Sequence, residues 1–208
     1  MRGAYLGPEY DQTEIEGQLA AVGADFKTLD DDAVIDITVE ALEAGKAVGW
    51  FQGRMEFGPR ALGGRSILGD PRSPKMQKTL NLRVKYRESF RPFAPSVLRE
   101  DVTEWLELDC DSPYMLLVDN VKFDKRRQMS VEEEALFGIE KLNIKRSEIP
   151  AVTHVDYSAR IQTVHKNTNP IYYNLILEFY KLTNCPVIIN TSFNAVSYTH
   201  LTLPTNRE

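Results

Sequence analysis

The stretch Pro186-Val-Ile-Ile-Asn-Thr-Ser-Phe-Asn194 joins a short apolar run to a polar end. Its β-branched residues predict a buried strand that ends near Asn190. Upstream, Asn169-Pro170 is typical of a helix start. One side of that helix is expected to carry Ile171, Leu175, Phe179 and Leu182. A helix that leads into a buried strand favours a mixed α/β fold, in which ligands bind beyond the carboxyl ends of strands.

Other helices and strands are expected to alternate along the chain. Apolar spacing predicts helices over residues 11–19 and 31–44, and a third from an N-cap at Ser73 to Tyr86. Strands are predicted over residues 46–51 and 114–118, and a strand or hairpin with a bend at Asp156-Tyr157 over residues 151–164. Phe90–Leu98 should be extended, but its prolines favour an edge or bulged strand.

Length and composition limit the class of protein. The 208 residues suffice for one domain and are 42% hydrophobic, as expected of a globular protein. No apolar run approaches the roughly 20 residues of a membrane helix, and the first residues lack the apolar core of a signal peptide. We therefore expect no membrane partner and a cytoplasmic location. Cys110 and Cys185 form neither a zinc pattern nor a disulfide framework.

Positive charge is concentrated in one part of the chain. The formal net charge is -5, yet residues 52–91, called here the basic segment, contain ten Lys or Arg and only three Asp or Glu. The rest of the chain is therefore strongly acidic. An acidic protein that gathers its cations in a fifth of its length is suited to attract an anion there.

The basic segment begins with the loop Phe51-Gln-Gly-Arg-Met-Glu-Phe-Gly-Pro-Arg-Ala-Leu-Gly-Gly-Arg-Ser66. Glycines and a proline shape the backbone between Arg54, Arg60 and Arg65, and guanidinium groups held in this way suit phosphate or carboxylate. The loop lacks the Gly-x4-Gly-Lys order of a P-loop. The alternative is that these arginines pair with the acidic excess elsewhere in the chain.

Lys85 lies near the end of the helix predicted to reach Tyr86, and Arg91 lies near the start of the extended segment that follows. Side chains at a helix end and a strand start can converge on the mouth of a pocket, although a solvated basic face is the simpler interpretation. The mixture of basic and aromatic residues here also allows a non-catalytic anion- or RNA-binding module. Two prolines and the acidic remainder make nucleic acid an unfavoured partner.

Two further groups of polar residues lie near the C-terminal end. His154 and Arg160 are close in the sequence, but a single histidine is often structural, and no His or Cys partner completes a metal site. Asn190 and Ser192 end the predicted buried strand. Ser192 lacks the nucleophile elbow Gly-x-Ser-x-Gly, so hydrogen bonding to a ligand is favoured over nucleophilic attack. A plain strand-end turn is the alternative.

Four ordered blocks together resemble a known family. They are residues 51–63, 84–97, 153–164 and 190–194, and they are similar to the C-terminal domain of the O-carbamoyltransferases of nodulation-factor and antibiotic tailoring. The resemblance covers residues 31–194. It implies a YrdC-like fold, with a twisted mixed sheet and flanking helices around a basic cavity, similar to that of threonylcarbamoyl-adenylate synthases.

The resemblance also implies an activity. Such domains bind carbamoyl phosphate and ATP and form carbamoyl-adenylate, with release of phosphate and pyrophosphate, and Mg²⁺ accompanies the ATP. A preceding N-terminal transferase domain, which carries a metal-binding histidine motif, then passes the carbamoyl group to a hydroxyl. The implied catalytic residues are Lys85, Arg91 and Arg160. The substrate-binding set is Arg60, Arg54, Arg65, Ser192, Asn190 and His154.

The two ends of the chain depart from this pattern. Residues 1–30 resemble a remnant of the preceding domain or a linker, so the acceptor-binding half of the enzyme is expected to be missing. Residues 195–208 match nothing that the family pattern predicts. We expect them to be a non-native tail.

Overall fold

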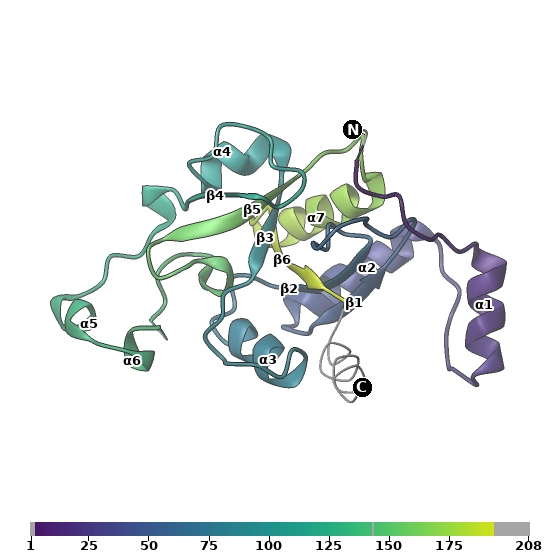
Figure 1. The fold of residues 1–208 in the computed structure, drawn as a ribbon, viewed down its shortest axis with the longest axis horizontal. Coiled ribbons are helices and arrows are strands. Elements are labelled where there is room, and N and C mark those ends of the chain that lie inside the picture. Colours follow the sequence, from purple (N-terminus) through teal and green to yellow (C-terminus); the bar gives the residue numbers. More distant parts are fainter. Residues whose placement is uncertain (1–2, 143, 194–208) are drawn as a thin grey trace, which may run out of the picture.

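Strand β6 (Val187–Ser192) lies inside an open six-stranded mixed sheet of the computed structural model, which describes residues 3–142 and 144–193 (Figure 1). The strand order is β1-β2-β6-β3-β5-β4. The other strands are β1 (Val48–Phe51), β2 (Arg65–Gly69), β3 (Ala94–Leu98), β4 (Leu117–Asn120) and β5 (Ser158–Val164). The predicted tail, residues 195–208, lies outside the described residues.

The sheet is mixed because one pair of neighbours is parallel. β3 pairs with β5 in parallel, and the four other neighbouring pairs are antiparallel. The expected mixed α/β class and the buried strand ending near Asn190 are therefore confirmed. The strand predicted over residues 46–51 is also confirmed as β1, with a slightly later start.

Strand β3 corrects one expectation. It lies between β6 and β5, so the prediction of an edge strand is wrong. The ladder between β3 and β5 begins only at Ser96, one residue after Pro95. Proline is tolerated at the start of a ladder because its missing N–H then removes no established bond.

Strand β4 is shifted from its predicted position. Met115 has a φ of 56°, which ends the extended conformation there, and the strand begins at Leu117. The bend predicted before β5 is confirmed, because Tyr157 has a φ of 67° and β5 starts at the next residue.

Helices α2 (Asp31–Glu43) and α7 (Pro170–Thr183) pack against each other, and α7 also contacts β3 and β6. Both predicted starts are confirmed: the side chains of Asp30 and Asn169 accept hydrogen bonds from N–H groups of the first turn. The predicted apolar side of α7 is only partly right. Its buried residues are Tyr172, Tyr173, Leu175, Ile176 and Phe179, whereas Leu182 is exposed.

Shorter elements complete the chain. They are helices α1 (Gln12–Ala21), α3 (Met76–Arg83), α4 (Val102–Trp105), α5 (Val131–Ala135) and α6 (Ile139–Leu142), and the 3₁₀ turns Arg99–Asp101, Phe123–Lys125 and Pro150–Val152. Helix α3 starts later than expected. Ser73 accepts a main-chain hydrogen bond from Met76 in a turn before the helix, and its side chain caps nothing, so the N-cap prediction was wrong.

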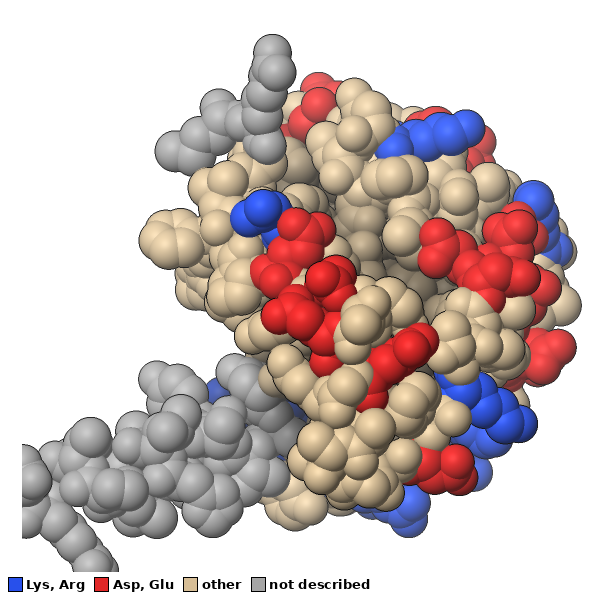
Figure 2. Space-filling model, turned by 90° about the vertical axis from the view of Figure 1, so that its right-hand side faces the viewer, with Lys and Arg blue, Asp and Glu red and all other residues tan. Residues whose placement is uncertain are grey.

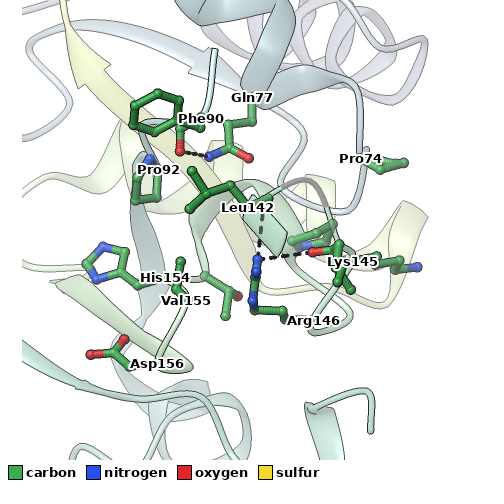
Figure 3. Close-up of a pocket in the computed structure, with 13 residues that line it drawn as sticks. Pro74, Gln77, Phe90, Pro92, Leu142, Lys145, Arg146, His154, Val155 and Asp156 are labelled. Atoms are coloured by element: carbon green, nitrogen blue, oxygen red, sulfur yellow. Dashed lines mark hydrogen bonds between the residues drawn. The ribbon is translucent and has the colours of Figure 1, made fainter. Parts of the chain in front are cut away.

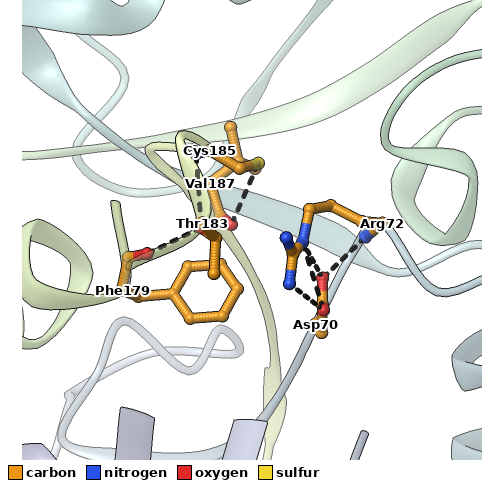
Figure 4. Close-up of polar contacts among 6 residues, drawn as sticks. All are labelled: Asp70, Arg72, Phe179, Thr183, Cys185 and Val187. Carbon is orange, nitrogen blue, oxygen red and sulfur yellow. Dashed lines mark hydrogen bonds and ion pairs between the residues drawn. The ribbon is translucent and has the colours of Figure 1, made fainter. Parts of the chain in front are cut away.

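The end of α7 is joined to β6 by a small cluster (Figure 4). Asp70 accepts hydrogen bonds from the main chain and guanidinium of Arg72, whose cation lies 5.4 Å from the ring centre of Phe179. Cys185 is buried beside it and donates to Val187 O. Burial raises the pKa of this thiol to about 12, so it is not a reactive thiolate at neutral pH.

The acidic remainder of the chain is visible at the surface. On the face turned to the viewer in Figure 2, acidic side chains predominate over basic ones. Within the described part of the chain, no helix combines the length and apolarity that crossing a bilayer requires.

Gly63 provides a test of the packing between α7 and the loop that precedes β2. Its φ is +103°, and a Cβ at this position would lie 2.6 Å from Cγ of the buried Tyr172. We expect Gly63→Ala to lower the free energy of unfolding by about 2–3 kcal/mol, measured by urea denaturation. The control is Gly17→Ala, because that added Cβ meets no atom within 4 Å. Equal urea midpoints for the two variants would contradict the packing described here.

Candidate anion-binding site

Three arginines from distant parts of the sequence line one cavity of about 170 Å³, called here the arginine cavity. Arg60 comes from the loop between β1 and β2, Arg87 from the segment after α3, and Arg160 from β5. The remaining lining residues are Pro59, Ala61, Pro92, Phe93, Ala94, Met115, Asn190, Thr191 and Ser192. None of these described lining residues is acidic. The cavity therefore presents cations without carboxylates among them.

None of the three arginines forms an ion pair within the described chain, and two of them also have buried polar atoms without a partner. Arg60 forms no ion pair there, and the Nη2 of Arg160 contacts only the sulfur of Met115, at 4.0 Å. The Nε atoms of both arginines are buried without a partner. Burial lowers the pKa of Arg160, and the positive charge of Arg60 lowers it further. Uncompensated cations in a partly buried cavity are stabilised by an incoming anion.

Arg87 is held in place more firmly. Its Nε donates to Asn81 Oδ1 at 2.6 Å, and its guanidinium lies 5.0 Å from the ring centre of Phe93. Burial lowers the pKa of Arg87, and the charge of Arg91 adds to this effect. A guanidinium fixed by an amide and an aromatic ring is pre-organised for bidentate binding.

Asn190 connects β6 to the loop that carries Arg60. Its Nδ2 donates to Ala61 O at 3.0 Å and to Gln162 Oε1 at 2.8 Å, while its Oδ1 is buried without a partner. Gln162 in turn donates to Leu62 O at 2.9 Å. The predicted site residue Asn190 thus lines the arginine cavity and also fixes its wall.

Lys85 reaches the same strand end as Asn190. Its Nζ donates to the main-chain oxygen of Ser192 and lies 3.4 Å from that residue's Oγ. Burial lowers the pKa of Lys85 to about 8, with a smaller contribution from Arg87. Lys85 is therefore mostly charged at pH 7 and loses its proton in a mildly basic range.

Two larger cavities adjoin the arginine cavity. One of about 280 Å³ shares Arg160, Phe93 and Pro92 with it and reaches His154. The next, of about 440 Å³, shares His154 and Pro92 with that second cavity (Figure 3). The three cavities are therefore neighbours that share lining residues, and together they offer more room beside the arginine cavity than it contains by itself.

The third cavity of this series is shaped by main-chain contacts. In Figure 3, Gln77 Nε2 donates to Phe90 O at 2.8 Å, and Arg146 donates to main-chain oxygens at the end of α6. Arg146 is buried, and its side chain supports the loop before β5.

His154 lines both adjoining cavities. Its Nδ1 lies 2.9 Å from Ser158 Oγ. Burial lowers its pKa, Asp156 opposes this, and Arg160 reinforces it, so the imidazole is neutral at pH 7. Among the described residues, no group of three or more His, Cys, Asp or Glu gathers as a metal site would require.

The remaining predicted residues do not line the arginine cavity. Arg54 pairs with Glu9 at 3.2 Å, and Arg91 pairs with Glu88 at 2.9 Å on the surface. Arg65 donates to the main-chain oxygens of Gln52, Gly64, Gly53 and Pro8 and lies 3.4 Å from the ring centre of Phe51. The alternative of internal pairing thus describes Arg54, the alternative of a solvated basic face describes Arg91, and Arg65 supports its own loop. Their roles in binding stay predictions.

Arg87 was not among the residues singled out in the sequence. It lies in the same basic segment as Lys85 and Arg91, but spacing alone does not show which cation turns inward. Tyr86, which separates Lys85 from Arg87, has a φ of 48°. The pattern of charges in a sequence does not predict that one residue adopts a left-handed backbone conformation.

The fold defines an α/β domain with a candidate anion site, and comparison with known proteins identifies its family. Residues 39–206 match the family described as carbamoyltransferase C-terminus, so the chain belongs to that family. It is 58% identical over 196 residues to an uncharacterised protein of Synechocystis, covering 93% of this chain and 32% of that protein.

Two named relatives are more informative. Nodulation protein NolNO of Sinorhizobium fredii is 40% identical over 195 residues, which cover 93% of this chain and 26% of that protein. The 3'-hydroxymethylcephem-O-carbamoyltransferase of Streptomyces clavuligerus is 38% identical over 154 residues, which cover 74% of this chain and 25% of that protein. The chain thus spans about a quarter to a third of the length of these relatives.

The lowered pKa of Lys85 predicts a pH dependence. Because the lysine is charged below its pKa of about 8 and neutral above it, affinity for inorganic phosphate should fall as pH rises from 7.5 to 9.5. We expect a fall on the order of tenfold, the effect of one nearby charge, measured by isothermal titration calorimetry. The Lys85→Arg variant stays positively charged over this pH range, so its phosphate affinity should change much less between pH 7.5 and 9.5. An equal fall in both proteins would contradict the assignment to Lys85.

Proposed function

We propose that this chain binds carbamoyl phosphate and ATP and forms carbamoyl-adenylate, as one part of an O-carbamoyltransferase. The observation that carries the proposal is the arginine cavity, where Arg60 and Arg160 have no carboxylate partner among the described residues. Membership of the carbamoyltransferase C-terminal family supports it. In this proposal the domain is YrdC-like, and transfer to the hydroxyl acceptor uses residues outside this chain.

The volumes of the cavities assign the two proposed substrates to different cavities. At about 170 Å³ the arginine cavity is smaller than the roughly 300–1,000 Å³ typical of drug-sized ligands, and it suits a compact anion such as carbamoyl phosphate. ATP is several times larger and would occupy the adjoining cavities of about 280 and 440 Å³. Arg160 lines both the first and the second cavity, so it can contact both substrates.

The proposed chemistry balances with one water. Water cleaves carbamoyl phosphate into carbamate and phosphate, and a carbamate oxygen then attacks the α-phosphorus of ATP. The bond to the β-phosphate oxygen breaks, and carbamoyl-adenylate and pyrophosphate are formed. Fixed guanidinium groups stabilise the negative charge that moves onto the leaving oxygens. Mg²⁺ bound to the triphosphate would neutralise part of its charge.

Replacing the cavity arginines tests this function. We expect Arg60→Met and Arg160→Met each to lower carbamoyl phosphate-dependent pyrophosphate release about 100-fold or more, because each removes a charge-stabilising donor. Pyrophosphate release from carbamoyl phosphate, ATP and Mg²⁺ is followed with a coupled enzyme assay. The control is Arg127→Met, which removes an exposed arginine paired with Glu133.

Binding is measured alongside, since it needs no preceding domain. Calorimetry should show carbamoyl phosphate binding to the unaltered chain and to Arg127→Met, and much weaker binding to the two cavity variants. Wild-type rates and affinities in Arg60→Met and Arg160→Met would overturn the assignment of the site.

A further inference from the structure

Glu56 is a buried acid beside a site that should attract anions. It is only 6% exposed. Its Oε1 accepts hydrogen bonds from the main-chain N–H groups of Leu62 at 2.7 Å, Gly64 at 2.6 Å and Arg65 at 3.2 Å. Within the described chain, no Lys, Arg or His forms an ion pair with it. The carboxylate is thus satisfied by the backbone of its own loop.

These bonds close a short loop with Arg60 near its tip. Glu56 and Leu62 bound the loop, and between them Gly58 has a φ of +143° beside Pro59. The backbone after Arg60 is fixed from the other side as well, because Asn190 donates to Ala61 O. Removal of the Glu56 carboxylate would free three N–H groups and release only the Glu56 side of this arrangement.

Gly64 packs so closely against the Glu56 carboxylate that there is no space for a side chain at this position. A Cβ at Gly64 would lie 2.9 Å from Arg54 O and 3.2 Å from Glu56 Oε1. The end of the loop is therefore packed directly on the carboxylate of Glu56.

We propose that Glu56 is a positioning residue for the arginine cavity, which it serves by holding the loop that directs Arg60. Two effects oppose each other at this residue. As a negative charge near the cavity, Glu56 lowers the affinity for an anion; as the acceptor that closes the loop, it raises that affinity. We infer that the closure of the loop has the larger effect on affinity. Position matters strongly in such sites, since misplacement of a group by about 1 Å can lower a catalytic rate as much as 100-fold.

The two effects separate in a pair of variants, with inorganic phosphate as the probe and calorimetry on the full chain. Glu56→Gln removes the charge and keeps an oxygen acceptor, so its phosphate affinity should stay within about threefold of wild type. Glu56→Ala removes both, and its affinity should fall about tenfold. Glu56→Asp, whose carboxylate is one methylene shorter, should also weaken binding and covers the case in which the alanine variant does not fold.

Chemical rescue distinguishes positioning from a general loss of stability. Acetate can supply a carboxylate to the space left in Glu56→Ala, and it should restore part of the phosphate affinity there but not in Arg60→Met. A matched destabilised variant is Leu175→Ala, which removes a fully buried side chain of α7. It should lose stability and keep phosphate affinity.

The role of Glu56 rests on the proposed anion site. Amide hydrogen exchange tests this role separately from the proposed function. Exchange at Leu62 and Gly64 should speed up in Glu56→Ala and not in Glu56→Gln, whether or not phosphate binds. Tighter or unchanged phosphate binding by Glu56→Ala, or unchanged exchange at these amides, would overturn the positioning role and leave the proposed function standing. Failure of wild type to bind phosphate or carbamoyl phosphate, with faster exchange in the alanine variant, would instead count against the proposed function.

Discussion

The hydrogen bond from Asn190 Nδ2 to Gln162 Oε1, at 2.8 Å, is the contact on which the site depends. It joins side chains of β6 and β5 across β3, which lies between these strands. The same two amides donate to the main-chain oxygens of Ala61 and Leu62. The sheet thereby fixes the loop that carries Arg60. Both amides are almost fully buried. Exchange of Asn190 for an apolar residue would remove the side-chain donor of Ala61 O, and exchange of Gln162 would leave Leu62 O with the Tyr5 hydroxyl as its side-chain donor.

A rigid frame explains how several cations remain close together. Guanidinium groups that could move would turn toward solvent or toward the acidic excess of the chain, as Arg54 and Arg91 do. Arg87 is held by Asn81 and Phe93, and Arg160 stands on β5 among buried residues. Burial, and after it the positive charge of Arg60, lowers the pKa of Arg160. In the proposed function, a small anion bound in the cavity compensates these positive charges.

The sequence was sufficient for the α/β class, for the starts of α2 and α7, and for β6 with its polar end. Each of these depends on local patterns of apolar spacing or capping. Placement of β3 at the edge failed because the position of a strand in a sheet is set by distant pairing. Charge patterning located the basic segment but could not separate the cavity-lining Arg87 from the ion-paired Arg91, since their partners Asn81, Phe93 and Glu88 are set by tertiary contacts. The family resemblance was confirmed, and the substrates remain proposals.

The most direct test is a crystal structure of the chain soaked with carbamoyl phosphate. The account predicts density for the phosphate group between Arg60, Arg87 and Arg160, close to the end of β6. The guanidinium groups of Arg60 and Arg160 should contact its oxygens. Density found only beside Arg54, Arg65 or another surface cation, with an empty arginine cavity at saturating ligand, would contradict the central claim.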